Sequence, residues 1–147
     1  LESIDGDVQY PQVDINNNGH AIAVWAQDDG SSNSIYANVY TPGTGWGSAE
    51  LIETGDEGAY SPQVRLFPDG DAIAVWYQFE GPVRNIRANM YSTTTGWGDD
   101  ELIETDDTGN AMNQMVDIDD AGNAMVVWRQ FDGSIYNVMS NRYTAGH

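Results

Sequence analysis

The sequence lacks cysteine and lysine altogether, and it has only five arginines and two histidines. Without cysteine the chain can form no disulfide and no thiolate metal site, and it offers no cysteine nucleophile. The five cations stand against 23 aspartates and glutamates, so the formal net charge is −18. A field of that sign repels phosphate backbones and anionic lipids. We therefore expect neither nucleic acid nor a membrane surface as a partner.

Long apolar runs are absent as well. No stretch approaches the roughly 18 apolar residues of a membrane helix, and no basic segment followed by an apolar one marks a signal peptide. Apolar residues never keep a helical spacing. Short runs rich in Val, Ile, Tyr and Trp instead alternate with clusters of Gly, Asn and Asp. This pattern predicts an all-β fold.

One segment recurs three times in the chain. The runs AIAVWAQ, AIAVWYQ and AMVVWRQ place Trp25, Trp76 and Trp128 at intervals of 51 and 52 residues. A fixed period of this size indicates an array of supersecondary units. Four strands are predicted in each unit, and in the first they cover residues 12–15, 21–27, 35–40 and 50–53.

The chain starts and stops at different points of this repeat. Residues 1–7 (LESIDGD) resemble the segments that begin at Leu51 and Leu102, whereas the third repeat stops before its GWG turn and fourth strand. We therefore divide the single domain 1–147 into four parts. They are a closing outer strand and loop (1–10), two full repeats (11–60 and 61–111) and a third without its outer strand (112–147).

Four-stranded units of about 50 residues with this offset resemble the blades of a β-propeller, in which a strand from one terminus completes the blade at the other. The PQV, GxAxxVW and GWG motifs are similar to blade repeats of bacterial secreted and surface proteins over essentially the whole chain. That resemblance implies an extracellular or cell-surface location. The GWG turns also partly resemble the Asp-box of sialidase-like propellers, but they lack its Asp, so no sialidase activity is implied.

Propellers close with about four to eight blades, and this chain supplies three. We expect a homodimer that forms one six-bladed ring, in which each N-terminal strand completes the third blade of the partner. A half-ring would leave two apolar blade faces in water. Two alternatives stay open. The repeats could form a β-trefoil, which closes as a monomer, or the chain could be a fragment of a longer propeller.

The repeated tryptophans and glutamines are interpreted as structural residues. Each tryptophan lies in a strand that is apolar on both faces, which predicts a core position. A glutamine follows two residues later in each repeat, at Gln27, Gln78 and Gln130. These amides either face a ligand or tie neighbouring blades and loop backbones together. A second set recurs in the first strands, at Gln12, Gln63 and Gln114.

The first turn carries a possible cation site. Asp14, Asn16 and Asn18, followed by Gly19, match the opening of a calcium loop. The twelfth position of such a loop should supply a bidentate carboxylate, and here it is Trp25. A tight hairpin turn explains the same residues without a metal. We predict no cofactor, with Ca²⁺ at this turn as the alternative.

Motifs of hydrolytic enzymes are missing from the sequence, which has neither GxSxG nor HExxH. Adjacent carboxylates do occur, at positions 28–29, 99–100, 106–107 and 119–120. Residue types alone therefore leave a glycosidase pair open. Adjacent carboxylates on a strand or turn usually point apart, however, and we predict that the chain is not an enzyme.

Candidate ligand-binding residues lie where the repeats differ. Phe79 and Phe131 follow the repeated glutamine, and Arg84 lies in the loop EGPVRN. Together with Trp46 and Trp97 of the GWG turns, they offer aromatic and guanidinium contacts for a neutral glycan or a peptide. This predicts a non-enzymatic, lectin-like binding module. The alternatives are a glycan hydrolase of the propeller type and a structural spacer; for the GWG tryptophans the alternative is packing at blade edges.

Overall fold

The computed structural model describes residues 1–105 and 108–146, and all regular secondary structure among them is β-strand. The prediction of an all-β chain is therefore confirmed. Among the described residues there is no helix that is long and apolar enough to cross a membrane.

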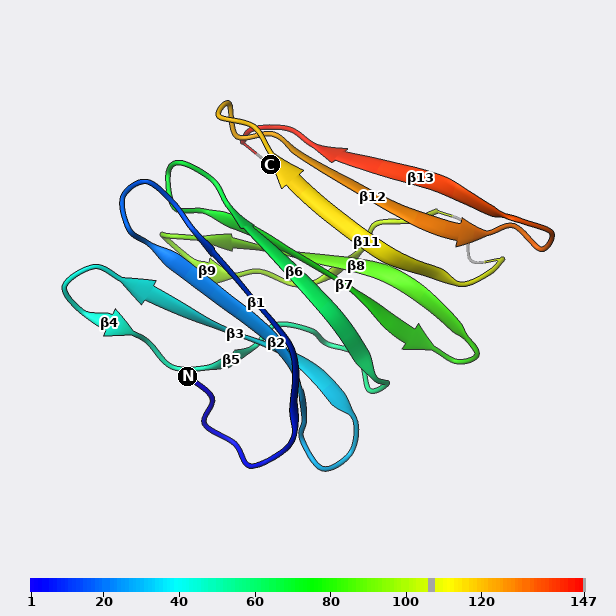
Figure 1. Cartoon of the computed structure of the whole chain (residues 1–147), viewed down its shortest axis with the longest axis horizontal. Helices are drawn as coiled ribbons and strands as arrows, with labels where there is room; N and C mark the ends of the chain where they lie inside the picture. The colour runs from blue at the N-terminus through cyan, green and yellow to red at the C-terminus, as the bar shows by residue number, and fades with distance from the viewer. Residues whose placement is uncertain (106–107, 147) are drawn as a thin grey trace.

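The strands form three antiparallel sheets, one for each repeat (Figure 1). The first sheet consists of β1 (Val8–Ile15), β2 (Ala21–Asp28), β3 (Asn33–Thr41), β4 (Gly45–Trp46) and β5 (Glu50–Leu51). The second consists of β6 (Ala59–Leu66), β7 (Ala72–Glu80), β8 (Val83–Ser92), β9 (Gly96–Trp97) and β10 (Glu101–Leu102). The third consists of β11 (Ala111–Ile118), β12 (Ala124–Phe131) and β13 (Tyr136–Tyr143). No described strand pairs across two sheets, an arrangement that is consistent with part of a β-propeller.

In the first two repeats the fourth strand is shorter than the sequence predicts. Only Glu50 and Leu51 pair with β3, and Ile52 and Glu53 turn into the buried space beside the next sheet. The GWG turn also forms a two-residue strand of its own, because Tyr40 pairs with Trp46.

Residues 1–7 form no strand, so the outer strand predicted there is not observed. Asn38 donates its side-chain amide to the carbonyl of Leu1 (3.0 Å), as Asn89 does to Ile52 (2.8 Å). Leu1 is thus equivalent to Ile52, the residue after an outer strand. The exchange of this segment with a partner chain stays a prediction.

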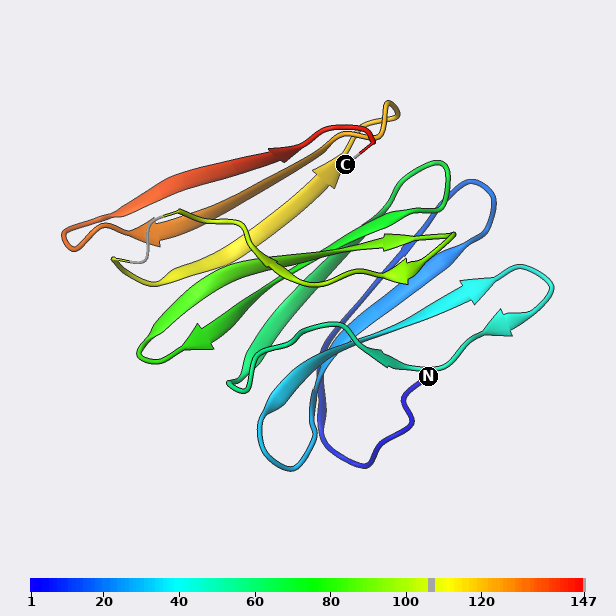
Figure 2. The same cartoon turned by 180° about the vertical axis from the view of Figure 1, so that it is seen from behind.

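The core lies between neighbouring sheets, which lie side by side in chain order (Figures 1 and 2). We call the contact of the first and second sheets the first junction, and that of the second and third sheets the second junction. Val24, Val64 and Trp76 pack in the first junction; Val75, Val116 and Trp128 pack in the second. The predicted core position of the repeated tryptophans is confirmed, because Trp25, Trp76 and Trp128 are at most 4% exposed.

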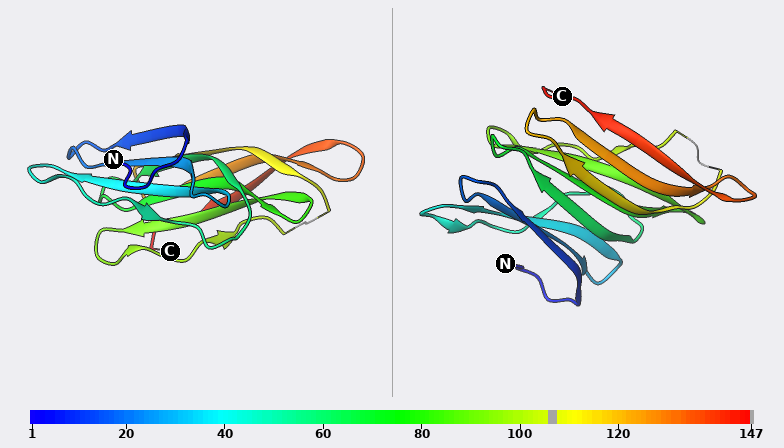
Figure 3. Two further views of the ribbon diagram at one scale, coloured as in Figure 1. Left: turned by 90° about the horizontal axis from the view of Figure 1, so that it is seen from below. Right: turned by 45° about the horizontal axis from the view of Figure 1, so that its top comes forward.

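Each sheet has two ends, which carry different loops (Figure 3). At the turn end, short turns connect β1 to β2, β6 to β7 and β11 to β12. At the hairpin end, loops connect β2 to β3, β7 to β8 and β12 to β13. A strand of about nine residues spans roughly 30 Å, so side chains at opposite ends are far apart.

A β-bulge interrupts the first strand of every sheet at the same place. Tyr10, Ser61 and Asn113 have φ of 52°, 54° and 57°, and the pairing register shifts around each of them. The left-handed region is unfavourable for residues other than glycine, so this backbone is strained. The register pairs Gln63 with Val75 and Met115 with Val127. Gln114 therefore matches a proline of the other repeats, and its predicted equivalence to Gln12 and Gln63 is wrong.

Candidate functional site

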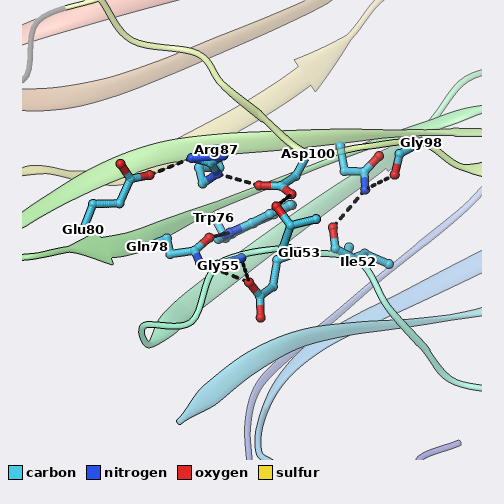
Figure 4. A network of polar contacts seen from close by, with 11 residues as sticks. Ile52, Glu53, Gly55, Trp76, Gln78, Glu80, Arg87, Gly98 and Asp100 are labelled. Atoms are coloured by element: carbon cyan, nitrogen blue, oxygen red, sulfur yellow. Dashed lines mark hydrogen bonds and ion pairs between the residues drawn. The ribbon is translucent and has the colours of Figure 1, made fainter.

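Gln27 and Gln78 bind the segment that precedes the first strand of their own sheet. We call the segment between two sheets a linker; the first linker comprises residues 52–58. In every sheet the indole N–H of the tryptophan donates to the glutamine oxygen, at 2.9 Å (Trp25 to Gln27), 3.1 Å (Trp76 to Gln78) and 3.0 Å (Trp128 to Gln130). Gln78 then donates to Glu53 at 3.0 Å (Figure 4). In the first sheet, Gln27 donates to the carbonyl of Ile4 at 2.8 Å. For Gln27 and Gln78, the interpretation as ties to loop backbones and neighbouring sheets is confirmed.

Buried carboxylates belong to the same linkage. Glu53 Oε2 accepts the backbone N–H of Gly55 at 2.7 Å as well as the amide of Gln78 (Figure 4). Burial raises the pKa of Glu53, and these hydrogen bonds only partly oppose that shift. Asp100 accepts from the Arg87 guanidinium and from the Thr54 hydroxyl, so it joins the linker to the second sheet.

The adjacent acidic pairs mostly stabilise turns. Asp29 accepts from the backbone and hydroxyl of Ser31 and from the backbone of Ser32, which lowers its pKa to about 2. Asp119 accepts from Asn123 and from the backbone of Ala121, and its pKa is also lowered. The pair at 106–107 lies outside the described residues.

The residues of the possible calcium loop are engaged in hydrogen bonds. Asp14 Oδ2 accepts the backbone N–H of Leu66 at 2.8 Å, across the first junction. Asn16 Oδ1 accepts the N–H groups of Asn18 (3.0 Å) and His20 (3.2 Å) within the turn. No group of three or more His, Cys, Asp or Glu that could hold a metal occurs among the described residues.

The structure separates the five predicted ligand-binding residues into two groups. Trp46 and Trp97 pair with the turn-end residues Tyr40 and Tyr91. Trp97 packs on Tyr91 with ring centroids 5.4 Å apart and touches the core of the first junction, whereas Trp46 is 41% exposed. Phe79, Phe131 and Arg84 lie at the hairpin end instead. One site cannot contain all five.

At the hairpin end, aromatic rings surround a guanidinium group. Arg84 lies over the rings of Tyr77 and Phe79, at 5.3 and 5.1 Å from their centroids. Tyr60 stacks against Tyr77 (5.6 Å) and meets Phe79 edge-on (6.0 Å). Burial of the Tyr77 hydroxyl raises its pKa, which Arg84 partly opposes. Phe131 instead packs on Tyr136 of the third sheet.

A cavity of about 520 Å³ opens beside this cluster, in the second junction, and we call it the arginine pocket. Its lining includes Ser61, Tyr77, Arg84, Asn113, Gln114 and Arg129. Arg84 Nη1 lies 3.8 Å from the sulfur of Met112, and Arg129 Nη2 lies 3.1 Å from the same sulfur. Two of the five arginines therefore converge on one atom. Two of the strained bulge residues, Ser61 and Asn113, line the same space.

Sequence reasoning found Arg84 but missed Tyr77, Met112 and Arg129. A signal was present, because the residue after the repeated tryptophan is Ala26 in the first repeat, Tyr77 in the second and Arg129 in the third. The variation lies inside the most regular strand, where the surrounding apolar residues suggest packing alone.

A second cavity, of about 510 Å³, lies at the turn end of the same junction. Its lining includes Phe67, Asp71, Tyr91 and Asp120. Asp71 Oδ1 accepts the backbone N–H of Thr93 at 2.8 Å, so this carboxylate stabilises the neighbouring turn. Neither GWG tryptophan is among the described residues that line the cavity.

The chain matches no protein-family model and no curated protein. Solved structures do resemble it. An endo-arabinase from Bacteroides thetaiotaomicron is 16% identical with a TM-score of 0.60, over 94% of this chain and 56% of its own. A glycosyl hydrolase from Bacteroides ovatus is 11% identical with a TM-score of 0.55, over 90% and 47%. A protein of unknown function from Dyadobacter fermentans is 12% identical with a TM-score of 0.63, over 90% and 36%. The chain spans about half or less of these proteins, and at such identities the likeness concerns the fold alone.

Proposed function

We propose that the chain is a glycan-binding part of a propeller-type protein, and that the arginine pocket is its binding site. The observation that carries this proposal is the convergence of Tyr77, Arg84 and Arg129 around one cavity of about 520 Å³. Cavities of roughly 300–1,000 Å³ that combine aromatic surface with a few polar groups are typical of small-molecule sites. Strained backbone at Ser61 and Asn113 is a further feature that clusters at ligand sites.

The ligand class follows from the side chains. An aromatic ring offers a flat apolar surface to a sugar ring, while guanidinium and amide groups hydrogen-bond to its substituents. The names of the resembling endo-arabinase and glycosyl hydrolase support a carbohydrate ligand, although their low identity to this chain shows a shared fold only.

The test is titration calorimetry with a panel of oligosaccharides, neutral and acidic. We expect at least one to bind, and Tyr77→Leu to weaken its binding at least about five-fold, because the aromatic surface is lost. Trp46→Ala is the matched control, since it removes an exposed aromatic ring from the turn end and should leave the affinity unchanged. If both variants weaken binding equally, the arginine pocket is not the binding site. If no oligosaccharide binds, the whole proposal is wrong, and a spacer role becomes the better description.

A glycan-acting hydrolase is the second candidate, and the hydrolase names of the resembling structures favour it. Such chemistry needs two carboxyl groups about 5–9.5 Å apart at the scissile bond. None of the described residues that line the arginine pocket is Asp or Glu. The test is the release of reducing ends from arabinan and other polysaccharides. Absence of product from the unmodified chain rejects this candidate.

We also propose that further repeats of the same kind cover the two outer sheets, in the form of a second copy of the chain. Val13 and Ile15 are 63% and 64% exposed, whereas Val64 and Leu66, at the same positions of β6, are 1% and 4% exposed. On the third sheet, Val127 is 37% exposed, but Val75, its counterpart in the second sheet, is fully buried. The two open faces are therefore the two halves of a missing junction.

The measurement is the mass in solution by light scattering. We expect a dimer, because exposed apolar faces of this kind associate. Val127→Glu should produce monomers, whereas Thr94→Glu, in an exposed turn, should not. A stable monomer of the unmodified chain would contradict the proposal.

A further inference from the structure

The two guanidinium groups of the arginine pocket have no acidic partner among the residues that the structure describes. Among the described residues, Arg65 pairs with Asp117, and Arg87 pairs with Glu80 and Asp100. Arg84 and Arg129 form no ion pair with any described residue, although the chain has 23 carboxylates.

What Arg84 and Arg129 do contact leaves their hydrogen-bonding capacity largely unused. Arg84 lies over Tyr77 and Phe79, and Arg129 lies 4.5 Å over the ring of Tyr136. A contact with an aromatic ring stabilises the positive charge, but it supplies no nitrogen or oxygen acceptor for the N–H donors of the guanidinium group. Within the described part of the chain, the only acceptor that the two share is the thioether of Met112, which is a weak acceptor.

A buried acceptor in the same pocket also lacks a donor. Gln114 is 3% exposed, and its Nε2 donates to the carbonyl of Ser61, which fixes the orientation of the amide. The other atom, Oε1, is buried and has no hydrogen-bond partner in the described structure. A buried acceptor without a donor is costly, so a ligand hydroxyl would be favoured there.

We propose that the glycan bound in this pocket is acidic, an oligosaccharide of hexuronic acid. Its carboxylate would pair with Arg84 and Arg129, because the planar guanidinium matches a carboxylate with two parallel hydrogen bonds. One of its hydroxyl groups would donate to Gln114. This inference rests on the proposed function, and it replaces the neutral glycan predicted from the sequence, since the local charge of the pocket is opposite to that of the whole chain.

The experiment uses tetragalacturonate and its fully methyl-esterified form in titration calorimetry at low ionic strength. The two probes share their hydroxyl groups and differ in charge. We expect the acid to bind at least about ten-fold more tightly, since hydrogen bonds between charged groups contribute roughly ten- to hundred-fold in affinity. Arg84→Gln and Arg129→Gln should each remove most of that difference and leave binding of the ester within two-fold. Arg142→Gln, which removes the same charge outside the pocket, should change neither affinity.

The outcomes separate this inference from the proposed function. Equal binding of acid and ester, or binding of a neutral oligosaccharide alone, overturns the inference but leaves a glycan site. No binding of any oligosaccharide overturns both. Tetra-aspartate that competes as well as tetragalacturonate would show a general anion site and also overturns the inference. Thermal melts of each variant distinguish loss of the ligand from loss of the fold.

Discussion

The two junctions have the same framework and different chemistry. At the first, Asn33 donates to the hydroxyl of Tyr60 at 3.3 Å, and Tyr60 stacks on Tyr77. By the pairing registers, the equivalent residues of the second junction are Arg84 for Asn33, Met112 for Tyr60 and Arg129 for Tyr77. The first junction thus has a neutral, mostly aromatic contact at the place where the second junction has two arginines around a sulfur atom. In a repeat protein, the positions that differ between equivalent junctions are therefore the candidates for function.

Interactions that recur at both junctions maintain the fold. They include the indole-to-glutamine hydrogen bond and the asparagine that binds the linker carbonyl, as Asn89 does for Ile52 and Asn141 for Ile103. Changes to this framework should affect stability, whereas changes to the residues that differ should affect binding. The following predictions test that separation.

The largest effect is expected from Gly55→Ala in the framework of the first junction. A Cβ at this position would lie 1.7 Å from Gln78 Nε2, so the buried amide must move away from Glu53. Overpacking and a lost buried hydrogen bond together should reduce the free energy of unfolding by about 2–4 kcal/mol, measured by urea denaturation. Gly47→Ala is the control, because its Cβ would meet nothing closer than 3.5 Å. Equal stability of the two variants would contradict the prediction.

A smaller effect on stability, and a large one on binding, is expected when the second junction receives the residues of the first. The double variant Arg84→Asn/Arg129→Tyr carries the counterparts Asn33 and Tyr77. Its affinity for tetragalacturonate should fall by about a hundred-fold, because two charge-assisted contacts are lost. Its free energy of unfolding should stay within about 1 kcal/mol, since these side chains are not part of the core. A loss of stability as large as that of Gly55→Ala would show that the arginines are framework residues.

The smallest effect concerns pH. Burial raises the folded-state pKa of Glu53 above its ordinary value of 4.5, so the folded state favours the protonated carboxyl. The associated stability is fully present below pH 4.5 and is lost as the pH rises through the folded pKa. Glu53→Gln should remove this decline. Urea denaturation over a pH series measures it, and parallel curves for the two proteins would mean that Glu53 does not titrate in this way.

Much of the fold could be predicted from the sequence. The 51- and 52-residue spacing of the tryptophans and the apolar strands around them indicate the sheets, since both reflect local preference and burial. The bulge could not be predicted, because Asn113 and Gln114 replace the Ser61-Pro62 pair and shift the apparent alignment by one residue. The candidate site was only half predicted. Arg84 was found from the turn residues predicted around it, although it lies in β8 opposite Phe79. Its position beside Arg129 depends on how two sheets meet, which no local pattern encodes.

The bulge at Tyr10, Ser61 and Asn113 has a consequence for how such a chain can evolve. A duplicated repeat inherits this kink together with its strand, and in the second junction the kinked residues Ser61 and Asn113 line the arginine pocket. Serine, tyrosine and asparagine all occupy it. Selection can therefore alter the side chains around each copy one at a time, and ligand preference can diverge between copies without any new backbone geometry.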